Sequence, residues 1–184
     1  MINTEKRIYM MSTQENENTH SGIEQEFHAK LTGENLKNAL DFASYWGTEN
    51  VTAESGDFCG TVKYKGNDIC YIKVGGFEDE ELDHWIIWSI HDADIAETPD
   101  FPVVAHIKEG FWTNVNQCGY FLSGGKHCGC GNQPGKRKAI FGKEFDNVCN
   151  SDIVFTNPDA DALEYAKTMV DLMKWKIDNN EYKN

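Results

Sequence analysis

The sequence has no apolar stretch that could span a bilayer. The longest strongly apolar run is Trp85-Ile86-Ile87-Trp88, whereas a transmembrane helix needs about 20 residues. The first residues contain no apolar segment typical of secretory signals, so we expect a cytoplasmic chain. Basic charge is also scarce, because 17 Lys and Arg face 30 Asp and Glu, a net charge of −13. This acidity disfavours duplex nucleic acid and anionic membranes as partners.

Several motifs of known catalytic and nucleotide-binding sites are absent as well. The chain contains no Gly-x-Ser-x-Gly, no His-Glu-x-x-His and no Walker-type loop. Any enzymatic function would therefore depend on the thiols. The sequence favours a protein that is not an enzyme.

Length and composition indicate one folded domain. The 184 residues are enough to bury a core without disulfides. Hydrophobic residues make up 40% of the chain and aromatic residues 12%, which is more than a disordered chain carries. Residues 1–22 are polar and predict a flexible tail. The remaining residues, 23–184, form the predicted domain.

Two amphipathic helices are expected, one near each end of this domain. Thr32 and Gly47 are a suitable N-cap and stop for the first helix, and Asn157 followed by Pro158 is a favourable start for the last. Residues 103–117 give a weaker helical pattern. The apolar stripes of the two stronger helices are Leu36, Ala39, Leu40, Ala43 and Trp46, and Leu163, Ala166, Met169, Val170, Met173 and Ile177.

The remaining periodic segments predict strands. A hairpin is expected around Gly66-Asn67, and a bulged register would place Val62, Tyr64, Cys70, Ile72 and Val74 on one buried face. The pattern of residues 84–91 predicts a strand that is covered on both faces. Residues 138–141 and 152–156 predict two short strands. The predicted fold is therefore α+β, an antiparallel sheet of four to five strands with the N- and C-terminal helices packed on it.

Cysteines cluster in the second half of the chain. Cys118, Cys128, Cys130 and Cys149 fall within a short span, and four thiolates converging on one ion are a common structural zinc site. Glycines beside Cys128 and Cys130 permit the tight turn that would bring both thiolates to the ion. His127 is a reserve ligand, since its neighbour Cys128 makes simultaneous ligation awkward. The spacing matches no standard zinc finger.

Two other interpretations of the thiols stay open. Cys128 and Cys130 could form a labile disulfide in a redox enzyme or sensor, with nearby lysines lowering their pKa values. Alternatively, the cysteines are packing or surface residues of a metal-free protein-interaction module. A binding or regulatory domain with a structural zinc site is the leading hypothesis.

A basic segment interrupts the acidic chain beside these cysteines. Its cations are Lys126, Lys136, Arg137 and Lys138, with no acidic residue before Glu144. This local reversal of charge predicts a surface for a small anion or an acidic protein partner. The alternative is a solvated loop whose charges pair with acidic residues elsewhere in the fold.

The C-terminal part also carries a resemblance. The stretch from Pro134 to Cys149, with Gly-Lys-Glu-Phe at 142–145, and the following residues 157–164 resemble the C-terminal half of a group of small uncharacterised bacterial proteins. These proteins share a cysteine-rich turn and a closing helix. The resemblance implies a bacterial or phage source and a cytoplasmic location, and it brings no activity with it.

Overall fold

The structure of this chain is a computed structural model. It describes residues 22–47, 50–56, 59–75, 82–91, 93, 95, 101–119 and 135–181. The predicted tail, residues 1–22, lies outside this part of the chain except for Gly22. None of the described helices combines the length and the apolar character that a membrane crossing requires.

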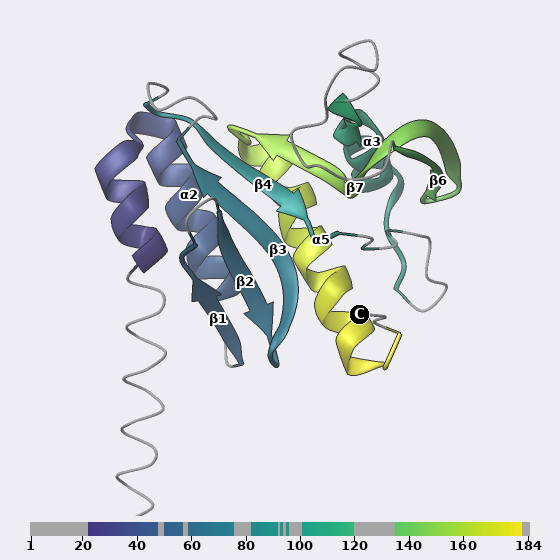
Figure 1. Cartoon of the computed structure of the whole chain (residues 1–184), viewed down its shortest axis with the longest axis horizontal. Coiled ribbons are helices and arrows are strands. Elements are labelled where there is room, and N and C mark those ends of the chain that lie inside the picture. Colours follow the sequence, from purple (N-terminus) through teal and green to yellow (C-terminus); the bar gives the residue numbers. More distant parts are fainter. Residues whose placement is uncertain are drawn as a thin grey trace, which may run out of the picture.

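Runs of antiparallel strands are separated by helices along the chain (Figure 1). Residues 22–30 are helical. The elements that follow are α2 (Gly33–Trp46), β1 (Val51–Glu54), β2 (Gly60–Tyr64), β3 (Asn67–Val74), β4 (Trp85–Ser89), α3 (Ala105–Thr113), β5 (Val115–Gln117), β6 (Lys136–Ile140), β7 (Lys143–Thr156) and α5 (Ala160–Asp178). The predicted mixture of helices and antiparallel sheet is confirmed. The predicted number of strands is wrong, because the sheet has seven strands within the described residues.

The long strand β7 joins the two parts of the sheet. The order is β1-β2-β3-β4-β7-β5, and β6 also pairs with β7. The C-terminal end of β7 pairs with β4, whereas its earlier residues pair with β5 and β6. Val148 is the partner of both Gln117 in β5 and Lys136 in β6, so it lies between these two strands.

The β2–β3 hairpin turns one residue earlier than predicted. Tyr64 pairs with Asn67, which leaves Lys65 and Gly66 as a two-residue loop. Both loop residues have positive φ angles, 50° and 79°, as tight hairpin turns require. Glycine adopts this backbone conformation without steric cost, and Gly66 has open space around it.

A bulge in β3 sets the buried face of this hairpin. Val62 pairs with Cys70 and Lys63 with Asp68, so Ile69 is the extra residue. The bulged register places Val62 and Cys70 in the core, as predicted. Ile69 is buried as well. The Tyr71 hydroxyl approaches the Asp68 carboxylate at 3.4 Å, which is consistent with these two side chains sharing the other face.

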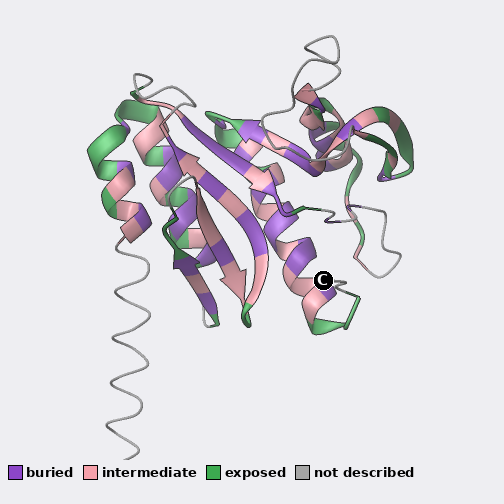
Figure 2. Cartoon of the chain, viewed as in Figure 1, coloured by how far each residue is buried: buried purple, intermediate pink, exposed green. Residues whose placement is uncertain are grey.

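Aromatic rings from two helices contact Trp85 in the core. The Phe27 ring, from residues 22–30, lies 5.9 Å from the Trp85 ring, and the Phe42 ring of α2 lies 6.3 Å from it. The last helix, α5, contacts α2, α3 and β3. In Figure 1, α2 and α5 run behind β1 to β4, and Figure 2 shows that buried residues are concentrated along these elements. The apolar core is therefore between the helices and this part of the sheet.

The helix starts are fixed by side chains that the sequence did not indicate. Thr32 is the N-cap residue of α2, as predicted, but its hydroxyl makes no capping bond. Its backbone N–H donates instead to Asp83 Oδ1 at 2.7 Å, so a distant loop caps the helix. At α5, Asp159 and not Asn157 is the N-cap residue, and its Oδ1 accepts from the Ala162 N–H at 2.9 Å.

Candidate metal site at the base of residues 119–135

Two of the four predicted zinc ligands fall in the described part of the chain. Cys118 directly follows β5 and is 1% exposed, and Cys149 is half-buried in β7. Cys128, Cys130 and the reserve ligand His127 lie outside the described residues. The structure therefore places one half of the predicted ligand set.

The β5–β7 ladder brings Cys118 and Cys149 to the same part of the sheet. Gln117 pairs with Val148, and each cysteine is the next residue after one member of this pair. The Cys118 N–H donates to the Asn147 carbonyl oxygen at 2.8 Å, which continues the ladder by one step. Cys149 follows Val148 directly, at the point where the β5–β7 register shifts.

Residues 119–135 begin and end beside this pair of cysteines. Gly135 packs so closely on Cys118 that a Cβ at position 135 would lie 2.6 Å from the Cys118 Cβ. The next residue, Lys136, pairs with Val148 from the side opposite Gln117. The two ends of the segment therefore lie close together, beside Cys118. Cys128 and Cys130 are carried by a segment that both leaves and returns at Cys118.

Neither Cys118 nor Cys149 forms a disulfide within the described part of the chain, so each sulfur could serve as a thiolate ligand. Tetrahedral zinc holds its sulfur ligands about 2.3 Å away. Among the described residues, no group of three or more His, Cys, Asp or Glu side chains could hold a metal. Completion of a site at Cys118 and Cys149 would need ligands from outside the described residues.

The basic segment is largely engaged with acidic side chains of β7. Arg137 forms ion pairs with Glu144 and, at 3.8 Å, with Asp146. The ammonium of Lys138 lies 2.5 Å from the Asp152 carboxylate, in a pair whose side chains are 17% and 2% exposed. Lys136 is exposed, and Lys126 lies outside the described residues. The acidic partners come from the neighbouring strand.

The two other thiols belong to different surroundings. Cys70 is fully buried in the core, as predicted, and burial raises the pKa of its thiol. Cys59 is half-buried just before β2. Burial also raises the pKa of the Cys59 thiol, and the positive charge of Lys73 opposes this increase only in part. Neither environment favours a reactive thiolate.

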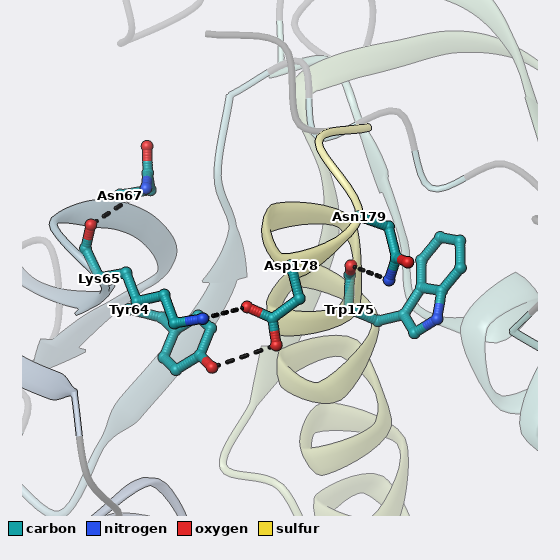
Figure 3. A network of polar contacts seen from close by, with 6 residues as sticks. All are labelled: Tyr64, Lys65, Asn67, Trp175, Asp178 and Asn179. Atoms are coloured by element: carbon teal, nitrogen blue, oxygen red, sulfur yellow. Dashed lines mark hydrogen bonds and ion pairs between the residues drawn. The ribbon is translucent and has the colours of Figure 1, made fainter.

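A second polar cluster, which the sequence analysis missed, joins the β2–β3 turn to the end of α5 (Figure 3). Lys65 forms a 2.6 Å ion pair with Asp178, and the Tyr64 hydroxyl donates to the same carboxylate at 3.2 Å. These contacts lower the pKa of Asp178 and raise that of Lys65. The charged residues on the solvent side of α5 could have indicated such a cluster. The residues that pair with them are set by the tertiary structure and could not be read from the sequence.

Comparison with known proteins found no matching family model, no matching curated protein and no matching solved structure. The resemblance to the group of small bacterial proteins therefore stays a prediction.

Proposed function

We propose that this chain is a binding or regulatory domain in which one zinc ion organises residues 119–135. The ligands in this proposal are Cys118 and Cys149 from the sheet and Cys128 and Cys130 from the segment. The observation that supports it best is the shared position of Cys118 and Cys149 beside the Gln117–Val148 pair. Residues far apart in the sequence thereby supply two thiols at the place where the segment begins and ends.

The composition of the segment gives the metal a physical role. Six of the 17 residues from 119 to 135 are glycine, and glycine loses the most backbone freedom on ordering. Structural zinc contributes an apparent binding free energy of about 10–16 kcal/mol in small zinc domains. The free energy of metal binding is therefore large enough to offset the entropy that such a segment loses when it becomes ordered. The thiolates must lose their protons to bind, so we expect zinc to be released as the pH falls.

The partner in this proposal is an acidic protein or a small anion. Arg137 and Lys138 are already paired with β7 carboxylates, so the attraction would come mainly from Lys126 and Lys136. Duplex nucleic acid remains disfavoured by the net charge of −13.

Metal analysis combined with thiol titration tests the proposal. The chain is purified under reducing conditions, and its zinc content and accessible thiols are measured before and after chelation. We expect one equivalent of zinc and four of the six cysteines protected until the chelator is added. Cys118→Ser and Cys149→Ser should each lower zinc affinity strongly, whereas the matched control Cys59→Ser should leave it unchanged. If only Cys149→Ser retained zinc, His127 would be the fourth ligand.

Other results would favour the two alternatives. If the protein contains no metal and Cys128 and Cys130 oxidise rapidly and reversibly, the result would favour a redox enzyme or sensor over a zinc site. A metal-free protein with six ordinary thiols would leave a protein-interaction module without a metal or redox centre.

A further inference from the structure

Strand β6 forms an exposed edge of the sheet. It pairs with β7 and with no other strand within the described residues. Its residues Lys136, Arg137 and Ala139 are exposed, whereas Val51 and Ala53 of the edge strand β1 are buried. The outer side of β6 is therefore open to solvent, and a further strand could be added there.

The turn between β6 and β7 fixes which main-chain groups point outward. Ile140 pairs with Lys143 across the two-residue turn Phe141-Gly142, whose φ angles are 45° and 78°. The residues that close such a turn exchange main-chain hydrogen bonds, and bonded positions alternate along an antiparallel pair. By this alternation the N–H and C=O of Ala139 point away from β7. Unpaired edge groups of this kind are a template for another strand.

The charge of this edge favours an acidic partner. Lys136 is exposed, and Arg137 pairs with the exposed carboxylates of Glu144 and Asp146 on β7. Exposed ion pairs contribute little stability, so Arg137 can exchange them for another carboxylate. A strand added beside β6 would lie about 4.8 Å from β6 and about twice as far from β7, so the cations would be nearer than the β7 carboxylates. Salt screens the more distant charges more strongly.

We propose that the open edge of β6 binds an extended acidic segment of a partner protein by strand addition. This inference rests on the proposed function for the acidic partner, and it adds the form in which that partner binds. Main-chain hydrogen bonds at Ala139 supply part of the affinity. Lys136 and Arg137 are successive residues of a strand and point to opposite faces, so the bound segment carries acidic side chains on both of its faces.

Binding of a synthetic peptide to the full chain tests strand addition. The probe is fluorescein-labelled Val-Glu-Glu-Val-Glu-Glu-Val, and its control is the same peptide with every main-chain nitrogen methylated, which keeps the charge and removes the donors. Fluorescence anisotropy should show at least about tenfold weaker binding of the methylated peptide. Equal affinities would overturn this inference and leave the acidic partner of the proposed function standing.

Two further outcomes separate this inference from the proposed function. If neither peptide bound, the acidic partner of the proposed function would fail together with strand addition. The zinc content of the same samples is measured as well. A metal-free protein that discriminates between the two peptides would remove the zinc site and retain strand addition.

Substitutions in β6 separate the main-chain contribution from the charge. Ala139→Pro removes the outward N–H at an edge position, where proline is tolerated, and should weaken binding of the unmodified peptide at least about fivefold. The matched control Lys136→Gln should weaken both peptides by a similar factor, because it removes only charge. Unchanged binding by a folded Ala139→Pro variant would exclude strand addition at this edge. Circular dichroism checks the fold of each variant, and the peptide pair decides if Ala139→Pro is unfolded.

Discussion

The two parts of the sheet are stabilised in different ways. Strands β1 to β4 pack with α2 and α5 around an apolar core, in which the rings of Phe42 and Trp46 are 5.1 Å apart. Strands β5 to β7 contribute fewer buried apolar side chains. Their stabilising contacts include the Lys138–Asp152 ion pair and the Trp112 Nε1–H bond to the Ile140 carbonyl oxygen at 2.8 Å.

This difference indicates which part of the molecule depends on a ligand. The helix-covered part contains most of the buried apolar side chains among the described residues. The β5–β7 part contains a three-residue strand and two register shifts, and it carries the proposed zinc ligands. We therefore expect metal removal to loosen β5–β7 and to leave the main core intact. The following substitutions test this contrast.

The largest effect is expected in the main core. Phe42→Ala removes a fully buried ring that contacts Trp46 and Trp85, and it should lower the free energy of unfolding by about 3–5 kcal/mol. The control is Phe145→Ala in β7, a half-buried ring that should cost only about 1–2 kcal/mol. Urea denaturation followed by circular dichroism measures both. Equal losses would remove the contrast between the two parts.

A somewhat smaller effect is expected at the buried ion pair of the second part. Asp152→Ala leaves the Lys138 ammonium without this carboxylate in a mostly buried position, and it should cost about 3 kcal/mol. Arg137→Gln breaks exposed ion pairs and should cost less than about 1 kcal/mol. Thermal unfolding of both variants provides the measurement. Indistinguishable melting temperatures would show that burial of the ion pair is unimportant.

An intermediate effect is expected at the buried thiol. Cys70→Ser places a hydroxyl on the apolar face of β3, and it should cost about 1–3 kcal/mol. Because Cys70 belongs to the main core, a chelator should not change this loss. The free energy of unfolding is measured with and without chelator. Cys118→Ser is the contrasting variant: its loss of stability relative to the parent chain should become smaller when the chelator removes the metal from both proteins. A chelator-dependent loss for Cys70→Ser would contradict the separation.

The smallest effect concerns the loop that caps α2. Asp83→Ala removes the acceptor of the Thr32 N–H and places alanine at a φ of 61°, so a loss of about 1–2 kcal/mol is expected. Asparagine keeps an acceptor and tolerates this backbone angle, so Asp83→Asn should retain most of the stability. Amide hydrogen exchange in the first turn of α2 reports the effect locally. Unchanged exchange in Asp83→Ala would exclude the capping role.

Periodic patterns predicted the strongest elements of this fold. The apolar stripes located α2 and α5, and the alternation around Gly66 located the β2–β3 hairpin. Short strands were missed, because the four residues of β1 and the three of β5 carry too little alternation to recognise. The helical residues 22–30 were missed despite a usable signal. Ile23, Phe27 and Leu31 are buried at helical spacing, but the polar residues around them suggested only the end of a tail.

The candidate metal site shows a different limit of sequence analysis. The cysteine pattern selected Cys118 and Cys149, but their relation depends on which β7 residues pair with β5. A register shift between Val115 and Gln117 sets that pairing, and such irregularities leave no clear pattern in the chain. The ion pairs of Arg137 and Lys138 were likewise hidden, because they arise from the β6–β7 register.

The position of Val148 between β5 and β6 makes this chain a natural acceptor for inserted peptides. Its two flanking strands and the close packing of Gly135 on Cys118 hold the ends of residues 119–135 near each other, so a short turn can join them. The native excursion could be exchanged for a short turn, an epitope or a reporter loop while both attachment points keep their places in the sheet. The same scaffold would then display a chosen sequence from a fixed pair of anchors.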